Sequence, residues 1–493
     1  MPSQGAPIYV VCLNGEGHSL KVAVIEERPD RGQSRTPDRE SIEQSRGWRV
    51  TSKILLSGGC VLTLGPKTPN FTRADVLIDD GLVAEVGPGI RARDAERVDA
   101  TETIVMPGFV DTHRHAWTSL FRNLGERASN GRASGAASLG DHYQPDDIYA
   151  ATLIGLLGAV EAGVTTVVDW SQIAADGSLA DSALRAHADS GLRTVFVDAA
   201  GHGTQGHAAP GSARERIARL ISAAGPRTSI AVGSVVPEST DLGRLADEWS
   251  LARDLGVRIH AHVDPGSSGR GVISEIGTQG LLGADVTLVH CSALDDADID
   301  AVAASGASIS LAPSSEMTGG AGSPPIQQFV DRDVRPGLGV DDERMTPGDM
   351  FAQMRATISV QHAVVFDLKL AGKAGVPRLM STRDVIRYAT VDGARVAGVS
   401  HVTGSLEPGM QADVIVLRTD RPNIFPINDP IGAVVWGMDT SNLDWVLVGG
   451  RVLMRNGVLE ADVPRARSLA TTARQRVADA SGLGVAAAAG GER

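Results

Sequence analysis

The sequence predicts an α/β protein whose main part is a closed (β/α)8 TIM-like barrel. Eight short apolar segments alternate with amphipathic stretches, and this alternation is typical of parallel strands connected by helices. No glycine-rich dinucleotide-binding motif follows any of these segments, which disfavours an open doubly wound sheet. Eight units are the number that closes a barrel. The expected strands are residues 109–115, 163–170, 192–200, 228–236, 257–264, 286–292, 307–313 and 334–342.

The regions on either side of the barrel, which we expect over residues 107–401, have a different pattern. Residues 52–106 and 402–460 contain short β-type runs separated by Gly-Gly and Asn-Gly turns, which are hairpin signals. We expect these two flanks to pair into one small composite β-sandwich domain. Residues 1–51 form an N-terminal extension that we expect to be poorly ordered, because much of it is polar and charged. Residues 461–493 are expected to form a C-terminal helix and tail.

The composition excludes several classes of protein. The formal charge of the 493 residues is −13, which argues against a nucleic-acid or anionic-membrane partner, since either needs a basic face. The three cysteines are too few for a disulfide framework. No apolar run is long enough to span a membrane, and the N-terminus lacks the layout of a signal peptide. We therefore expect a cytoplasmic protein.

Polar residues stand where several of the apolar strands end. Five of the 12 histidines, together with one aspartate, lie at four of these ends, and the carboxyl ends of barrel strands meet at the face where active sites of this fold lie. Imidazoles with a carboxylate suit a divalent ion such as zinc. A single histidine on a strand is more often a hydrogen-bonded core residue, and an aspartate can be a helix cap, but the clustering favours a metal site. The residues are His113 and His115 after the first strand, His260 and His262 in the fifth, His290 in the sixth and Asp341 in the eighth.

Longer motifs around these residues resemble the amidohydrolase superfamily. The segments MPGFVDTHRH, GVTTVVDW, VHC and LGVD are followed by YATVDGARVAGVSHVTGSLEPGMQADVIVL. Together they resemble the branch that contains cytosine, guanine and methylthioadenosine/adenosylhomocysteine deaminases and triazine hydrolases. The resemblance extends from about residue 52 to residue 460. It implies the same barrel and the same split β-domain.

The resemblance also implies a role for each candidate residue. His113, His115 and His262 match metal ligands, and Asp341 matches the carboxylate that binds the metal and takes a proton from water. His290 matches a catalytic histidine that polarises the substrate. The fourth expected strand, residues 228–236, contains no lysine, so one divalent ion is expected: zinc first, with Fe²⁺ or Mn²⁺ as alternatives. Members of the superfamily are commonly dimers or tetramers, so a homo-oligomer is expected.

Two departures from the superfamily pattern bear on the reaction. Its deaminases carry a glutamate three residues after the fifth-strand histidine, and this chain has Pro265 there. Asp264, one residue short of that position, is a candidate catalytic residue in its place. Asp341 is followed by Asp342 and Glu343, so an acidic wall that favours a cationic substrate is expected if these side chains face inward.

These observations predict an enzyme that acts on a small molecule. The expected function is metal-dependent hydrolysis of a C–N bond in a cyclic amide, an amidine or an amino-substituted N-heterocycle. The alternatives are a purine or pyrimidine deaminase that releases ammonia, a dehydratase or dehalogenating hydrolase, and a barrel scaffold that has lost catalysis. The candidate substrate-binding residues are Trp117, Arg122, Trp170 and His260, although packing for Trp117 and a salt bridge for Arg122 are equally compatible with the sequence.

Overall fold

The computed structural model describes residues 8–11, 22–25, 53–124, 139–172, 177–199, 210–236, 242–263, 270–319 and 322–483. The chain divides into two compact units, Met1–Val50 and Thr51–Arg493. Within the first unit, strands β1 (Ile8–Val11) and β2 (Val22–Ile25) pair in antiparallel fashion. Most of the predicted extension at residues 1–51 lies outside the described residues. All further statements concern the second unit.

Eight parallel strands form the barrel, and each overlaps one of the eight predicted segments. The strands are hydrogen-bonded in chain order, and the last returns to the first through a parallel bridge between Arg114 and Asp341. Two backbone hydrogen bonds complete this closure, from His115 N to Asp341 O (3.0 Å) and from Asp341 N to His113 O (2.8 Å). The predicted fold is therefore confirmed. The strands are β8 (Phe109–Arg114), β9 (Val164–Ser171), β10 (Arg193–Asp198), β11 (Thr228–Val235), β12 (Arg258–Val263), β13 (Val286–His290), β14 (Ser308–Leu311) and β15 (Gly337–Leu338).

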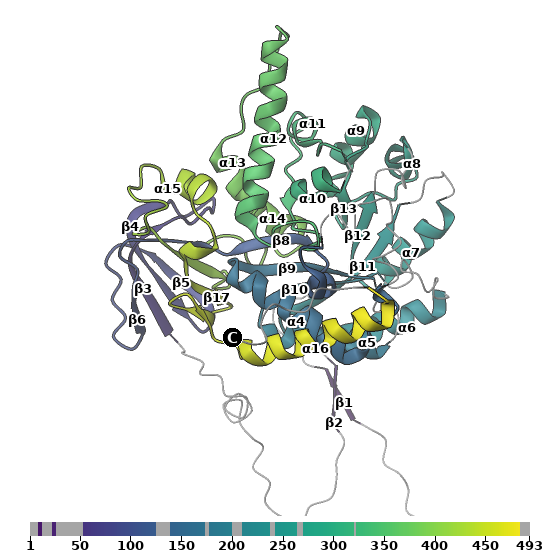
Figure 1. Cartoon of the computed structure of the whole chain (residues 1–493), viewed down its shortest axis with the longest axis horizontal. Coiled ribbons are helices and arrows are strands. Elements are labelled where there is room, and N and C mark those ends of the chain that lie inside the picture. Colours follow the sequence, from purple (N-terminus) through teal and green to yellow (C-terminus); the bar gives the residue numbers. More distant parts are fainter. Residues whose placement is uncertain are drawn as a thin grey trace, which may run out of the picture. The chain divides into compact units, whose positions relative to one another are not determined.

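Helices surround these strands (Figure 1). Several begin at a side-chain cap, such as Asp295, which accepts a hydrogen bond from Asp298 N at the start of α9 and so satisfies a helix-end donor. The short 3-10 helix η1 (Ala116–Phe121) follows the first strand directly. The helices are α4 (Pro145–Glu161), α5 (Gly177–Ser190), α6 (Pro210–Ala223), α7 (Gly243–Asp254), α8 (Val272–Thr278), α9 (Asp296–Ser305), α10 (Pro313–Thr318), α11 (Ile326–Val330), α12 (Met350–Leu370), α13 (Thr382–Tyr388), α14 (Val391–Val396), α15 (Pro430–Gly432) and α16 (Val463–Ser481).

The two flanks form one mixed sheet, as the sequence predicts. Its central pair joins the flanks, because β7 and β16 run antiparallel with Met106 opposite Ile415. Aliphatic residues such as Ile54, Val76 and Leu447 form the core on one side of this sheet. The strands are β3 (Lys53–Val61), β4 (Phe71–Asp79), β5 (Leu82–Gly87), β6 (Glu96–Asp99), β7 (Thr103–Pro107), β16 (Val414–Arg418), β17 (Leu443–Val448), β18 (Arg451–Arg455) and β19 (Val458–Leu459). We call this mixed sheet, formed by β3–β7 and β16–β19, the composite sheet.

A buried ion pair attaches the composite sheet to the barrel. Arg193, the first residue of β10, donates from Nε to Asp413 Oδ2 (2.9 Å) and from Nη2 to Asp413 Oδ1 (3.1 Å). The same carboxylate accepts from Gly449 N at 2.7 Å, between β17 and β18. Asp413 belongs to the GMQAD motif, so this motif serves the connection between the two parts of the fold.

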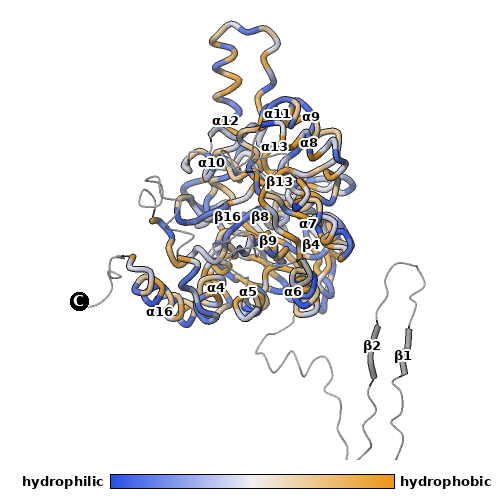
Figure 2. Tube along the Cα trace, turned by 90° about the vertical axis from the view of Figure 1, so that its right-hand side faces the viewer, coloured by the Kyte–Doolittle hydropathy of each residue, from blue (hydrophilic) through white to orange (hydrophobic). Residues whose placement is uncertain are grey.

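Helix α12 projects from the rest of the second unit in Figure 1. Its outer end carries exposed apolar side chains, among them Val364, Phe366 and Leu370. Figure 2 shows both hydrophobic and hydrophilic positions along the projecting part of the tube. Across the residues that the structure describes, no helix combines the length and the apolar character needed to cross a membrane.

Candidate metal centre and active site

Four predicted ligands come together at the carboxyl ends of β8, β12 and β15. The Nε2 atoms of His113 and His262 are 3.1 Å apart. Oδ1 of Asp341 lies 3.3 Å from His113 Nε2 and 3.2 Å from His115 Nε2. All four side chains are buried. The ligand atoms form two triads that share His113: those of His113, His115 and Asp341 lie within 4.8 Å of one another, and so do those of His113, His262 and His290.

These three separations are compatible with donor atoms around a small cation. Zinc is bound by histidine nitrogens and carboxylate oxygens at about 2.0–2.1 Å in a tetrahedral arrangement, which places neighbouring ligand atoms roughly 3.3 Å apart. The observed contacts of 3.1, 3.2 and 3.3 Å agree with that spacing. Three nitrogens and one oxygen are also a donor set that zinc accepts. The residues present therefore fit the expected metal.

The pKa shifts of His113 and Asp341 favour their metal-binding forms, whereas that of His115 favours its protonated form. Burial holds the pKa of His113 well below its usual value, so its ring is neutral and offers a lone pair. Burial alone would raise the pKa of Asp341, but contacts with His113 and His115 outweigh it and hold this pKa well below the ordinary range. For His115, burial by itself would lower the pKa. The contact with Asp341 outweighs this effect, so the pKa of His115 is raised. The carboxylate is thus charged.

His290 joins the cluster through an unusual backbone. Its ring centroid lies 5.1 Å from that of His262 and 5.4 Å from that of His113. Within β13, Val286 and Leu288 belong to the large hydrophobic core, so a regular strand would direct His290 toward that side as well. Instead His290 has a φ of 71°, and Asp341 at the other side of the cluster has a φ of 65°. Such backbone strain is commonly retained at functional sites.

The predicted substrate-binding residues take several different places. Trp170 stacks on His262 with ring centroids 4.0 Å apart, so it packs against the ring of a predicted metal ligand. Trp117 is buried and packs edge-on against Tyr143. His260 is fully buried, and burial lowers its pKa to about 3. A direct contact of these side chains with substrate stays a prediction, as does the role of Asp264, which lies outside the described residues.

The acidic residues after Asp341 are paired with arginines. Glu343 lies 3.2 Å from Arg114 and 2.9 Å from Arg122, and Asp342 accepts from the Arg344 guanidinium. The side chain of Arg122 is therefore in the salt bridge that the sequence left open as its alternative. Because these carboxylates have arginine partners within the protein, the prediction of an uncompensated acidic wall beside Asp341 is wrong.

Two neighbours of the cluster, Ser315 and Glu316 in α10, are absent from the sequence-based candidates. Ser315 Oγ donates to Asp341 Oδ2. Glu316 Oε1 lies 3.3 Å from His290 Nδ1 and accepts from Ala312 N at 2.8 Å. The available signal was their position, because the segment PSSEMT directly follows the seventh barrel strand. Serine and glutamate are common in the first turn of a helix, so their presence there did not distinguish them as site residues.

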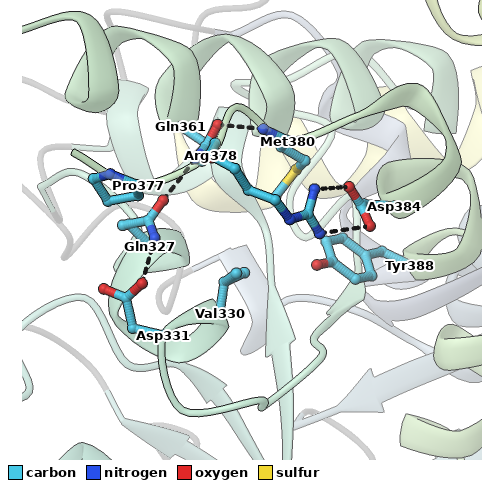
Figure 3. Close-up of a pocket in the computed structure, with 9 residues that line it drawn as sticks. All are labelled: Gln327, Val330, Asp331, Gln361, Pro377, Arg378, Met380, Asp384 and Tyr388. Atoms are coloured by element: carbon cyan, nitrogen blue, oxygen red, sulfur yellow. Dashed lines mark hydrogen bonds and ion pairs between the residues drawn. The ribbon is translucent and has the colours of Figure 1, made fainter. Parts of the chain in front are cut away.

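A separate pocket lies between α11, α12 and α13 (Figure 3). Its polar side chains bind one another: Gln361 donates to Gln327 at 2.6 Å, Gln327 donates to Asp331 at 2.6 Å, and Arg378 pairs with Asp384 at 2.9 Å. None of its lining residues belongs to the histidine cluster. These mutual contacts explain the polar lining without a ligand.

The amidohydrolase family model matches residues 104–453, which include the barrel and both members of the β7–β16 pair. The chain belongs to the amidohydrolase family. Among its relatives, it is 29% identical to 5'-deoxyadenosine deaminase of Methanothermobacter thermautotrophicus, over 83% of this chain and 94% of the relative. It is 27% identical to 5-methylthioadenosine/S-adenosylhomocysteine deaminase of Symbiobacterium thermophilum, over 81% of this chain and 93% of the relative.

Solved structures show the same fold. An adenosine deaminase from Xanthomonas campestris with bound zinc superposes with a TM-score of 0.74 at 19% identity, covering 86% of this chain and 98% of that one. An atrazine chlorohydrolase from Arthrobacter aurescens complexed with zinc gives 0.73 at 21% identity, covering 85% and 100%. With the family and the cluster together, the chain is a metal-dependent hydrolase of C–N bonds other than peptide bonds, as the sequence predicts.

Proposed function

We propose that this amidohydrolase is an aminohydrolase that removes the amino group from the purine ring of an adenosine-type nucleoside, with a modified 5' position, and releases ammonia. The main support is the pair of ligand triads that share His113, one with His115 and Asp341 and the other with His262 and His290. The substrate class is suggested by the relatives named above, which act on 5'-deoxyadenosine, 5-methylthioadenosine and S-adenosylhomocysteine. Of the sequence-based alternatives, deamination is therefore preferred.

We further propose that the cluster holds one zinc ion. His113, His115 and His262 would supply nitrogens and Asp341 an oxygen, in agreement with the 3.1–3.3 Å spacing of these atoms. When bound in such a set, zinc lowers the pKa of water from 15.7 to about 7 and so supplies a nucleophile at neutral pH. Iron and manganese are the alternatives to zinc, and metal analysis of the purified protein distinguishes among the three. Cytoplasmic location and self-association stay predictions.

The side chains around this point have complementary roles. Asp341 is ionised and takes a proton from the attacking water, while Ser315 Oγ holds its second oxygen. The water oxygen forms a bond to the ring carbon that carries the amino group, and His290 stabilises the charge that develops on the substrate. Asp341 then returns its proton to the amino nitrogen, the C–N bond breaks, and ammonia leaves.

Pro265 supports a second candidate function. It stands where the resemblance expects a glutamate, and proton donation by such a group is worth roughly 10²–10⁴ in rate. A heterocycle or cyclic amidine with a better leaving group would depend less on that proton. Hydrolysis of another C–N bond is therefore the alternative to test.

The test is ammonia release by the zinc-loaded chain from 5'-deoxyadenosine, 5'-methylthioadenosine, S-adenosylhomocysteine and adenosine, with Asp341→Asn as the matched inactive control. We expect one equivalent of ammonia per nucleoside consumed, with kcat/KM on the order of 10⁴ M⁻¹s⁻¹ or higher for the preferred substrate. No ammonia from any of the four nucleosides, with metal bound, would contradict the nucleoside proposal. Turnover of cyclic amidines by the same preparation would then support the second candidate.

A further inference from the structure

Two consecutive residues of helix α10 contact two different residues of the candidate active site. Ser315 reaches Asp341, and Glu316 reaches His290. The helix starts at Pro313, shortly after β14. Its backbone is bonded to α12, because Ser314 N donates to Gln353 Oε1 at 3.2 Å. A turn that contacts both Asp341 and His290 is placed to control their orientation.

Glu316 is an unusual side chain for this position. Glu316 is only 1% exposed. Burial of a carboxylate costs free energy unless hydrogen bonds compensate for the lost solvation. One oxygen, Oε1, bonds to Ala312 N and His290 Nδ1, while Oε2 is buried without a hydrogen-bond partner among the described residues. Burial raises the pKa of Glu316, and His290 partly offsets this effect. Of the two contacts of Glu316 Oε1, the one with His290 connects the buried carboxyl group to the active site.

His290 needs such an anchor. Its backbone is left-handed, with a φ of 71°, and so is that of Cys291, with a φ of 63°. These residues lie at the point where the pairing of β13 with β14 has already ended, since its last partners are Val289 and Ser310. The strand ladder on that side therefore does not fix the ring, and side-chain contacts have to do so.

We propose that Glu316 is a positioning residue for His290: its carboxyl group holds the Nδ1 edge of the ring, so that the opposite edge stays directed at the substrate. This inference deepens the proposed hydrolytic function and rests on it for the role of His290. In the same turn, Ser315 holds Oδ2 of Asp341 and leaves Oδ1 for the cluster. The turn Ser315–Glu316 thereby aligns the proton acceptor and the charge-stabilising histidine with each other.

The kinetic test compares Glu316→Ala with Glu316→Gln in the full-length, zinc-loaded chain. Outer-shell partners of site histidines are typically worth about 10–100-fold, so Glu316→Ala should lower kcat by that factor with KM changed less than about threefold and metal content unchanged. Glu316→Gln keeps an oxygen that accepts both hydrogen bonds and should recover kcat to within a few-fold of the original chain. Unchanged kcat in Glu316→Ala, or a Gln variant as slow as the Ala variant, would overturn the proposal.

A second readout needs no substrate and separates this inference from the proposed function. Nitrogen-15 labelling of the histidines, with the His290 signals assigned by a His290→Gln variant, reports which ring nitrogen carries a proton. In the original zinc-loaded chain we expect a protonated Nδ1 at His290, and in Glu316→Ala a loss of this preference. An unprotonated Nδ1 in the original chain would overturn the inference even if adenosine-type nucleosides are turned over, and a protonated Nδ1 would support it even if they are not.

Asp75→Asn is the matched control for loss of a buried carboxylate. Asp75 in the composite sheet accepts from Ser57 Oγ, Gly58 N and Ile90 N, so it resembles Glu316 in burial and in binding backbone. Its substitution should lower thermal stability and leave kcat and the His290 spectrum unchanged. A change in the His290 spectrum equal to that in Glu316→Ala would show a general effect of destabilisation and would overturn the specific role.

Discussion

The barrel mouth and the composite sheet bury opposite kinds of side chain. At the mouth, His113, His115, His262 and Asp341 are buried against one another, whereas the composite sheet encloses aliphatic residues such as Ile54 and Leu447. Burial of aliphatic side chains stabilises a fold directly, but burial of polar groups costs free energy unless each is bonded. The difference indicates that the composite sheet serves stability, and that the mouth retains a costly arrangement for its chemistry.

The largest effect is expected at the mouth. His262→Ala removes one nitrogen of the cluster and the ring on which Trp170 stacks. We expect loss of most bound metal and a fall in kcat/KM of at least about 10³-fold, because metal-ion catalysis supplies the nucleophile. Metal analysis and kinetics on the same preparation measure both. A variant that loses metal but keeps full activity would remove the chemical contrast between the two regions.

Asp341→Asn tests the proton acceptor separately from the metal. The amide keeps an oxygen of the same size near His113 and His115 but is a very weak base, so kcat should fall by roughly 10²–10⁴-fold. The chain should keep its fold and much of its metal. Activity equal to that of the original chain would refute the assignment of Asp341 as the base.

The connection between the two regions should respond in stability alone. Asp413→Ala leaves Arg193 buried without its carboxylate partner, and breaking a buried pair in this way costs about 3–5 kcal/mol. Urea unfolding measures the loss, and kcat of the folded fraction should stay unchanged. A fall in kcat with unaltered stability would mean that the composite sheet takes part in catalysis.

The smallest effect is expected within the composite sheet. Ile54→Val removes one methylene group from a fully buried position in its aliphatic core, which typically costs about 0.5–1.5 kcal/mol. Thermal unfolding should detect this decrease, with metal content and kcat unaffected. Loss of metal in this variant would show that the sheet and the mouth are coupled more tightly than their contents suggest.

The sequence predicted those features that repeat along the chain. Apolar strands ending in histidine or aspartate located β8, β12, β13 and β15 and predicted that the four proposed ligands lie at one end of the barrel, because strand order in a barrel follows chain order. The paired flanks followed from their turn residues. These features depend on local patterns that each strand carries by itself.

Features that depend on contacts between distant residues were not predictable in the same way. Glu316 meets His290 across 26 positions, and Glu343 meets Arg114 and Arg122 across more than 200. The sequence showed the acids after Asp341 but not the arginines that neutralise them, so it predicted a charged wall where the structure has ion pairs. A left-handed φ at His290 likewise has no signature in residue type.

Metal stoichiometry tests the central claim most directly. The purified full-length chain is analysed by mass spectrometry of metals before and after dialysis against a chelator, and again after zinc is restored, with hydrolysis measured at each stage. The account predicts about one zinc per chain, loss of activity with loss of metal, and recovery of both together. Full hydrolytic activity in a chain with less than about one-tenth of an equivalent of any metal would contradict it.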